Sequence, residues 1–477
     1  MTLVADLERA LGAAAVLSEP AELRTYECDG LTGHRAVPRA VVLPRSTEEV
    51  KAAVRVCREH KAPFVARGAG TGLSGGAVPV AEGIVVGLAR MNRILEVDVP
   101  NRRVRVQPGV TNLDVTRAVA AHGLFYAPDP SSQQVCTIGG NVAENSGGAH
   151  CLKYGFTSTH VLELVVVLSD GEAVRLDRDG PLDLAGAFVG SEGTLGIATE
   201  VVVRVVPRPQ RVETLLAAFP STDAAGEVVS AIIGAGIVPA AVEMMDALTI
   251  QAAEDAVHAG LPRDAGAVLL VELDGPAAEV ELTRSRVEAL CAEGRASEVR
   301  VAADETERAG LWHGRKAAFA AMGRVSPDYY VQDGVVPRTR LPQTLRRIEE
   351  LSNRYGLRVG NVFHAGDGNL HPLVLYDAAV EGEAERAERL AAEILEACVD
   401  AGGSLTGEHG IGVDKVCSMP WMFSEGDIRA MEGLRAAFDP DGLCNPGKLL
   451  PTPRLCGEVP GPYRRHPLER GGVAERF

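Results

Sequence analysis

The stretch Arg67-Gly-Ala-Gly-Thr-Gly-Leu-Ser-Gly-Gly-Ala-Val-Pro79 lies between two apolar, strand-like segments, 63–66 and 83–86. Glycine permits positive φ and lets backbone N–H groups approach a ligand closely. Successive amides in such a turn form an anion-binding site, so we expect the stretch to hold a phosphate or pyrophosphate. It leads into a β-branched run and not into a helix, which favours a strand–loop–strand cradle over a βαβ turn. A plain glycine-rich turn between strands is the alternative.

Length and charge narrow the class of protein. The chain has 477 residues and a formal net charge of -16 at pH 7, which predicts two or three domains and argues against nucleic acid and anionic membrane surfaces. No apolar run reaches the roughly 18–20 residues of a membrane span, and residues 1–15 show no secretory signal. The nine cysteines include no C-x-x-C pair. We therefore expect a cytoplasmic protein with reduced thiols and no cysteine-held cluster of its own.

Hydrophobic periodicity divides the chain near residue 208, at Pro207-Arg-Pro209. Beyond this point strands alternate with amphipathic helices, which predicts an α+β second half. The segment 125–150 has few core-forming residues and no helical period, so we expect a long functional loop packed on a flat polar ligand. Helices are expected at 46–60, 111–122, 222–234, 277–291, 305–324, 341–355, 381–401 and 425–438.

A second group of candidate residues lies beyond residue 300. His364 and His371 flank a predicted turn between two strands, where two neutral imidazoles would form half of a metal site. Glu408, in a glycine-flanked turn, would complete a His₂Glu ligand set, and His409 would stand beside it as a base. Arg315, on a predicted helix, would bind a carboxylate in a bidentate fork. Histidines that only cap or pack, and an arginine on a solvated surface, are the alternatives.

Five motifs in order make a family recognisable: 311–319, 326–330, 361–369, 407–412 and 438–448. The first half resembles the FAD-binding domain of the vanillyl-alcohol-oxidase (PCMH) type, which D-lactate and D-2-hydroxyglutarate dehydrogenases share. The second half resembles the FAD-linked oxidase C-terminal domain, and the whole is similar to the FAD-linked subunits of bacterial glycolate oxidases. The resemblance implies an α+β fold, with an antiparallel sheet in an α+β cap domain. The expected parts are a lead-in (1–37), the FAD-binding domain (38–208), the substrate or cap domain (209–424), a segment returning to the FAD domain (425–452) and a flexible tail (453–477).

The same resemblance implies FAD as a non-covalent cofactor. Its pyrophosphate would lie in the cradle, and residues 137–141 and 145–148 would line the flavin. His150 lies in the same loop, but we do not expect it to anchor the flavin covalently. The residues expected to bind FAD are Arg67, Gly68, Ala69, Gly70, Thr71, Gly72, Ser74, Gly75, Pro128, Thr137, Gly139, Gly140, Asn141, Asn145, Gly147, Gly148, Glu192, Ile197 and Asn445.

The resemblance assigns the second group as well. His364, His371 and Glu408 match the ligands of a divalent metal, Zn, Mn or Fe, in the metal-dependent members. His409 matches the proposed base and Arg315 a substrate-carboxylate arginine. The implied reaction oxidises a 2-hydroxy acid by hydride transfer from C2 to flavin N5.

Two departures from the family bear on the substrate. The 2-hydroxyglutarate branch has a lysine and an asparagine where this chain has Val331 and Leu373. A distal carboxylate would lose both partners here, so we expect a small monocarboxylate, glycolate or D-lactate.

The resemblance also implies partners, namely a second FAD-domain subunit and an iron–sulfur subunit. It allows peripheral attachment to the membrane through such a partner. Three alternatives stay open. One is a stand-alone D-lactate dehydrogenase that passes electrons to quinone or cytochrome. Another is a metal-dependent hydrolase with purely structural glycine loops, and the third is a non-catalytic FAD-binding subunit.

Overall fold

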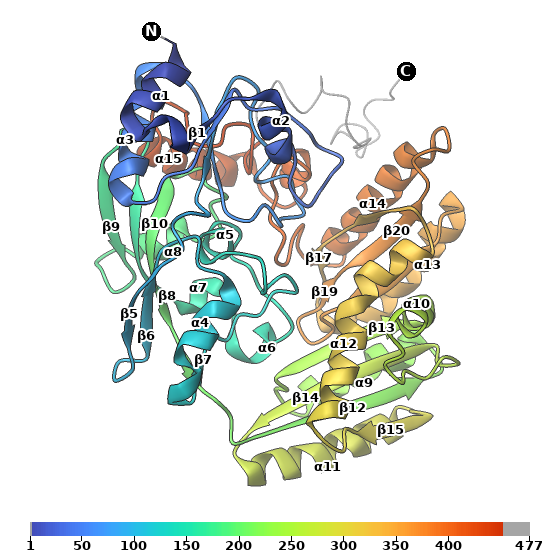
Figure 1. Cartoon of the computed structure of the whole chain (residues 1–477). Helices are drawn as coiled ribbons and strands as arrows, with labels where there is room; N and C mark the ends of the chain where they lie inside the picture. Colours follow the sequence, from blue (N-terminus) through green and yellow to red (C-terminus); the bar gives the residue numbers. More distant parts are fainter. Residues whose placement is uncertain (1, 452–477) are drawn as a thin grey trace. The chain divides into compact units, whose positions relative to one another are not determined.

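The computed structural model describes residues 2–451 of the chain (Figure 1). Its contacts define two compact units. The first consists of residues 2–208 and 408–451, and the second of residues 209–407. The sequence predicts that the chain returns to the first domain at residue 425, whereas in the structure residues from 408 onward belong to the first unit. The functional domain boundaries stay predictions. The expected tail at 453–477 lies outside the described residues.

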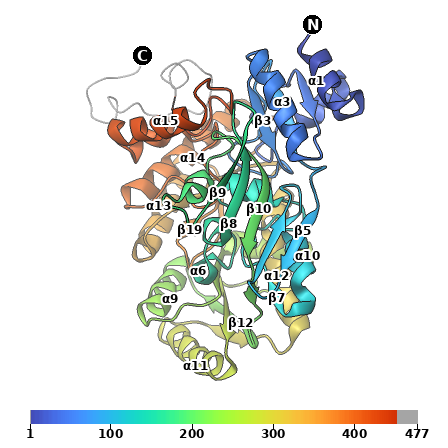
Figure 2. The same ribbon diagram turned by 90° about the vertical axis from the view of Figure 1, so that its left-hand side faces the viewer.

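The strands of the first unit form a four-stranded sheet, a five-stranded sheet and a separate pair. Their bounds are β1 Val16–Leu17, β2 Ala40–Val42, β3 Phe64–Arg67, β4 Ile84–Gly87, β5 Ile94–Asp98, β6 Arg103–Val106, β7 Leu124–Phe125, β8 Val161–Val167, β9 Ala173–Asp177, β10 Ile197–Arg204 and β11 Val206–Pro207. The four-stranded sheet has the order β1-β2-β4-β3, with β2, β4 and β3 parallel. The other sheet, β5-β6-β10-β8-β9, is antiparallel throughout, and Figure 2 shows its strands side by side. Strand β7 pairs with β11.

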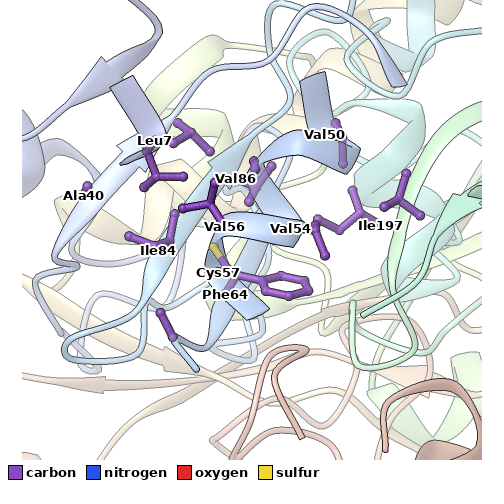
Figure 3. Packing of buried hydrophobic residues seen from close by; sticks show 14 of the residues in the cluster. Leu7, Ala40, Val50, Val54, Val56, Cys57, Phe64, Ile84, Val86 and Ile197 are labelled. Atoms are coloured by element: carbon purple, nitrogen blue, oxygen red, sulfur yellow. The ribbon is translucent and has the colours of Figure 1, made fainter. Parts of the chain in front are cut away.

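The helices of the first unit cover these sheets. Their bounds are α1 Leu3–Leu11, α2 Pro20–Leu23, α3 Thr47–Glu59, α4 Asn112–Val119, α5 Ile138–Glu144, α6 Cys151–Tyr154, α7 Thr157–His160, α8 Leu184–Phe188 and α15 Glu425–Phe438. Helix α3 begins where the sequence predicts, because the Ser46 hydroxyl accepts a hydrogen bond from the Glu49 amide. Its apolar side chains pack on strand residues in a buried hydrophobic cluster that includes Val50, Val54, Cys57, Phe64, Ile84, Val86 and Ile197 (Figure 3).

The predicted strand–loop–strand cradle is confirmed. Strands β3 and β4 are parallel neighbours, with Phe64 opposite Ile84. The connection between them, residues 68–83, contains turns and bends but no helix. Without a helix to take up the crossover, the glycine-rich loop itself carries the chain from the end of β3 back to the start of β4.

The prediction that 125–150 has no helix is wrong. Helix α5 begins after Thr137, whose hydroxyl accepts a hydrogen bond from the Gly140 amide, and it ends at Asn145 in the left-handed conformation (φ 49°). Two glycines and an asparagine obscure its pattern because they have low helix propensity. The N-cap and the αL residue define its ends instead.

The second unit is built on one seven-stranded antiparallel sheet, as the predicted α+β class requires. Its order is β15-β12-β14-β13-β18-β20-β16, and β17 and β19 form a separate pair. The strand bounds are β12 Arg211–Phe219, β13 Ala241–Asp246, β14 Ala267–Gly275, β15 Glu298–Val301, β16 Asp328–Val331, β17 Gly334–Val335, β18 Val359–Phe363, β19 Asn369–Leu370 and β20 Pro372–Tyr376.

The helices of the second unit agree closely with the sequence pattern. Their bounds are α9 Thr222–Gly234, α10 Ala247–Val257, α11 Ala277–Glu293, α12 Glu305–Ala321, α13 Leu341–Tyr355 and α14 Glu383–Asp400. Helices α9 and α11 pack on β12 and β14, while α12 and α10 pack on each other and on β18 (Figure 1). The pattern predicts neither α10 nor β13. A charged residue, Glu243, interrupts the apolar run of β13 and conceals it.

Candidate active site

The glycine-rich cradle lies against the start of α5. Gly70 and Gly75 have φ values of 70° and 78°, a region that favours glycine. A Cβ on Gly68 would lie 2.4 Å from the Thr137 hydroxyl oxygen. Two segments expected to bind FAD, 67–76 and 137–148, are therefore brought together. Of the expected residues, Ala69, Thr71 and Gly72 lie in the same loop, and Gly139 and Gly140 lie in the first turn of α5.

Arg67 and Ser74 have different surroundings within the cradle. The Arg67 guanidinium donates to the Cys28 carbonyl oxygen (2.7 Å) and occupies the space beside Gly70. In this structure Arg67 therefore ties the loop to the backbone of Cys28. Its contact with FAD stays a prediction. The Ser74 hydroxyl is buried and has no hydrogen-bond partner within residues 2–451. An unsatisfied hydroxyl inside the cradle fits a site for a phosphate oxygen.

The polar side chains around α5 hold its loop in place. The Asn112 side-chain amide donates to the Pro128 carbonyl and to the Asn141 side-chain oxygen, both at 3.0 Å. Asn145 accepts from the Ser158 amide (2.8 Å). Asn112 and Asn145 thus satisfy backbone groups of neighbouring segments, whereas Asn141 bonds to another side chain. The predicted contacts of Pro128, Asn141 and Asn145 with FAD stay predictions.

At Gly147 and Gly148 the backbone lies so close to other groups that a side chain would collide with them. Gly148 has φ 139°, and a Cβ there would lie 2.5 Å from the Asp129 carbonyl. A Cβ on Gly147 would lie 2.8 Å from a carboxylate oxygen of Glu408. Glu408 belongs to the same unit, so a predicted metal ligand lies against the loop predicted to line the flavin. His150 Nδ1 lies 2.8 Å from an Asp129 carboxylate oxygen.

Glu192 holds the turn that follows Glu408 and His409. Its carboxylate accepts hydrogen bonds from the amides of Ile411 (2.6 Å) and Gly412 (2.7 Å). Burial raises the pKa of the Glu192 carboxyl, and these two amides oppose that rise. The structure therefore shows Glu192 as an anchor for the segment that carries two chemical candidates, and its contact with FAD stays a prediction.

Asn445 and Ile197 complete the residues expected at FAD. The Asn445 side-chain amide donates to the carbonyls of Gly76 (2.9 Å) and Glu192 (2.7 Å), so it ties the cradle to the segment that contains Glu192. Ile197 starts β10 and is buried in the hydrophobic cluster around α3. Neither arrangement tests a contact with the cofactor.

Glu144, which the sequence reasoning missed, is a partly exposed acid with one buried carboxylate oxygen. A carboxylate oxygen lies 2.6 Å from the Cβ position of Gly76, and the other lies 2.5 Å from that of Gly410. Burial raises the pKa of the Glu144 carboxyl well above its usual value, and the nearby charges of Glu192 and Asp29 raise it further. An acid in a predicted loop, four residues after two glycines, carries no sequence signal for such burial.

In the second unit, the two predicted metal histidines meet. His364 directly follows β18 and His371 directly precedes β20. Their ring centroids are 5.1 Å apart with the planes at 87°, and a ring nitrogen of one lies within 4.8 Å of one of the other. Both side chains are buried. The turn between the strands therefore brings the two imidazoles together, as predicted. Their role in metal binding stays a prediction.

Arg315 is buried, so the alternative of a solvated surface arginine is wrong. Only 4% of the residue is exposed. Its Nη2 lies 2.6 Å from a Glu243 carboxylate oxygen, and its Cζ lies 5.9 Å from the centre of the Phe319 ring. The buried Nε has no hydrogen-bond partner in the described part of the chain. An unsatisfied guanidinium N–H is a feature of a site that accepts an anion.

Glu243 and Asp333 are two acids that the sequence analysis also missed. Glu243 Oε1 lies 2.7 Å from His364 Nδ1. Burial acts to raise the pKa of Glu243, but His364 and Arg315 outweigh burial, so the pKa is lowered. An acid inside an apolar strand is the signal that would have revealed it, since such a charge needs partners.

Asp333 links His371 to the segment that leads to Glu408. An Asp333 carboxylate oxygen lies 3.8 Å from His371 Nδ1. The other oxygen accepts from the Thr406 hydroxyl (2.5 Å) and the Gly407 amide (3.0 Å). Glu408 and His409 follow directly in the chain and belong to the first unit.

Comparison with known proteins identifies the family. Residues 38–177 match the model of an FAD binding domain, and residues 208–449 match that of FAD linked oxidases, C-terminal domain. The glycolate oxidase subunit GlcD of Escherichia coli (strain K12) is 51% identical over 455 residues, which are 94% of this chain and 91% of that protein. A D-lactate dehydrogenase of Anaerostipes hadrus is 33% identical over 428 residues, 87% of this chain and 90% of that protein.

A solved structure of p-cresol methylhydroxylase shares the fold. It superimposes with a TM-score of 0.80 at 18% identity, over 94% of this chain and 96% of that one. An FAD-binding domain of this type, followed by an oxidase C-terminal domain, defines a flavin-dependent oxidoreductase. This chain belongs to the FAD-linked oxidase family and is an FAD-dependent enzyme. Within residues 2–451, no helix is both long enough and apolar enough to cross a membrane.

Proposed function

We propose that the chain oxidises a short 2-hydroxy acid, glycolate or D-lactate, to the 2-oxo acid. The activities in the names of two relatives, glycolate oxidase subunit and D-lactate dehydrogenase, support this reaction. The observation that carries it is the buried arginine beside two facing histidines in the second unit. A 2-hydroxy acid needs one cation for its carboxylate and one group that acts on its hydroxyl, and this cluster offers both.

Arg315 would bind the substrate carboxylate. One terminal nitrogen is paired with Glu243, which holds the guanidinium in place, and the buried Nε is left with a hydrogen to donate. Ionised hydrogen bonds of this kind are strong, and their planar geometry orients the acid. His409 would accept the hydroxyl proton at a ring nitrogen as C2 is oxidised.

His364, His371 and Glu408 would hold a divalent ion. The donor set of two imidazoles and one carboxylate is typical of catalytic Zn²⁺, and it also suits Mn²⁺ or Fe²⁺. The carboxylate contact at His364 Nδ1 leaves Nε2 as its ligand atom. When bound, such an ion would act as a Lewis acid toward the substrate hydroxyl.

The cradle fits the phosphates of FAD. Loop 68–83 has two left-handed glycines and no room for a side chain at Gly68. The buried hydroxyl of Ser74 has no hydrogen-bond partner among the described residues. The cofactor, when bound, supplies the hydride acceptor at flavin N5. Residues 137–148 would exclude water from that face of the flavin.

The preference for a monocarboxylate follows from a cross-strand pair. Val331 and Leu373 lie directly opposite each other in β16 and β20, so they point to the same face of the sheet. Leu373 is two residues beyond His371 in the chain, so it lies near the predicted metal ligand. A second carboxylate on that side would meet two aliphatic side chains, which give it no hydrogen bond.

Anaerobic absorbance spectra test the reaction. The purified protein, which is expected to show oxidised flavin, is mixed with glycolate and, separately, with D-lactate. Bleaching by one acid supports the proposal and names the substrate. Flavin that neither acid reduces, in a preparation loaded with metal, would refute it. D-2-hydroxyglutarate is the matched control and is expected to bleach the flavin far more slowly.

The electron acceptor distinguishes two versions of this function. The word subunit in the name of one relative supports a complex with other subunits. We expect these to be a second FAD-domain subunit and an iron–sulfur subunit, in the cytoplasm or peripheral to the membrane. The alternative is a stand-alone D-lactate dehydrogenase, the activity in the name of another relative. Such an enzyme would pass its electrons to quinone or cytochrome. Copurification of an iron–sulfur protein with the tagged chain would decide for the complex. A hydrolase with structural glycine loops is excluded, because the chain has an FAD-binding domain.

A further inference from the structure

Glu243 contacts both parts of the chemical cluster of the second unit, His364 and Arg315. It stands in β13, between the apolar residues Val242 and Met244, and is 1% exposed. One carboxylate oxygen lies 2.7 Å from His364 Nδ1 and the other 2.6 Å from Arg315 Nη2. A single side chain therefore connects a predicted metal ligand to the predicted carboxylate-binding arginine.

A carboxylate here is not explained by stability alone. Moving an ionised group into a buried strand has a large desolvation cost, and well-packed apolar residues usually stabilise such a position at least as well. The remaining buried residues of β13 are all apolar, namely Ala241, Val242, Met244 and Met245. Because both partners of Glu243 are themselves candidates for chemistry, its position is better explained by what it does to them.

The contact with His364 selects one ring nitrogen. A carboxylate accepts only, so His364 must carry a proton on Nδ1, and in the neutral ring the lone pair is then on Nε2. Metal-bound histidines almost always make such a contact, and removal of the partner typically weakens metal binding 10–100-fold. The contact with Arg315 uses Nη2 and leaves Nε unsatisfied, which directs the guanidinium edge toward an incoming anion.

We propose, on the basis of the function proposed above, that Glu243 is the positioning residue of this site. It presents His364 Nε2 to the metal ion and holds the Arg315 fork for the substrate carboxylate. Metal binding and acid binding are thereby coupled through one carboxylate, although Glu243 itself touches neither ligand.

Replacement Glu243→Gln tests this role with little change in volume. Both partners of Glu243 are donors, and glutamine offers one acceptor and one donor, so either His364 or Arg315 loses its acceptor. We expect the Kd for Mn²⁺ or Zn²⁺, measured by titration of chelator-stripped protein against a chromophoric chelator, to rise about 10–100-fold. With metal saturating, KM for glycolate or D-lactate is expected to rise while the FAD content stays at the wild-type level.

Glu272→Gln is the matched control. Glu272 is also a buried carboxylate, on the neighbouring strand β14, and it accepts from Trp312 Nε1 (2.6 Å) on the same helix as Arg315. The same chemical change there disturbs a buried network without touching His364 or Arg315. We expect Glu272→Gln to lower stability and to leave the metal Kd unchanged. Equal metal affinities in wild type and Glu243→Gln, or equal losses in both variants, would overturn the proposed role.

Two further measurements separate the possible failures. If wild-type protein binds no divalent metal and is reduced by neither acid, the proposed function itself fails. If wild-type protein binds the metal and is reduced by one of the acids, and Glu243→Gln does the same with equal affinity, the proposed function stands. Only the positioning role of Glu243 then fails. Should the variant not fold, ¹⁵N NMR of histidine-labelled wild type reads the tautomer directly, with His364 assigned by a His364→Gln sample. The Nδ1–H tautomer is expected, and the Nε2–H tautomer would overturn the proposed role.

Discussion

Replacement Gly68→Ala is expected to disrupt the cradle through one atom. The new Cβ would lie 2.4 Å from the Thr137 hydroxyl oxygen, whereas an ordinary contact is at least 3.4 Å. The hydroxyl must therefore move by about 1 Å, which breaks its hydrogen bond to the Gly140 amide at the start of α5. Loss of an N-cap costs about 0.5–2 kcal/mol, and overpacking costs about 1–3 kcal/mol. We expect Gly68→Ala to lower the free energy of unfolding of the FAD-binding unit by about 2–4 kcal/mol.

A double-mutant cycle isolates this collision. Thr137→Ala alone removes the cap and is expected to cost about 1 kcal/mol. In the double variant the colliding oxygen is gone, and the next atoms, N and Cα of Gly140, lie at ordinary distances of 3.5 and 3.6 Å from the new Cβ. The double variant should therefore be no less stable than Thr137→Ala alone, and more stable than Gly68→Ala.

Denaturant unfolding monitored by flavin absorbance, together with the FAD content after gel filtration, provides the assay. The coupling energy between the two sites is expected to be about 1–3 kcal/mol. Additive losses, or full FAD content and wild-type stability in Gly68→Ala, would show that the cradle and α5 do not meet as the structure has them.

Three further replacements test other parts of the first and second units. Burial first, and then the charge of Glu192, raise the pKa of Glu144, so the folded state keeps a proton that the unfolded chain loses above about pH 4.5. Stability should thus fall as pH rises, and the stability gained by Glu144→Gln should grow with pH in urea unfolding; a pH-independent difference would contradict this. Gly147→Ala pushes on the Glu408 carboxylate and should weaken metal binding about 10–100-fold in a chelator titration. Gly310→Ala, in α12 with nothing within 4 Å of its new Cβ, should stabilise by about 1 kcal/mol, and a loss would refute that packing.

The sequence predicts the fold well wherever pattern and local chemistry agree. Helix α3, capped by Ser46, and the helices at 222–234 and 341–355 lie where periodicity places them. The pairing of His364 with His371 also follows from two strands and a turn. In each case the signal is local, because the caps, turns and apolar periods lie within the element that they define.

The rest depends on contacts between distant segments. α5 escapes prediction because its glycines suppress the helical pattern, although Thr137 and Asn145 define its ends. Arg315 is typical of a solvated helix residue until Glu243, on a separate strand, is found opposite it. The partners of Glu243 lie 72 and 121 residues away in the chain, so no local rule connects them.

The arrangement of the segment 407–412 shows why these acids matter together. Its first amide, on Gly407, is bonded to Asp333 in the second unit, and two later amides, on Ile411 and Gly412, are bonded to Glu192 in the first. Glu408 and His409 lie between these bonds, on backbone that is fixed at both ends. A base and a metal ligand must be held within a few tenths of an ångström to act, and loops alone seldom achieve this. Asp333 and Glu192 therefore constrain the backbone on either side of the predicted ligand and the predicted base.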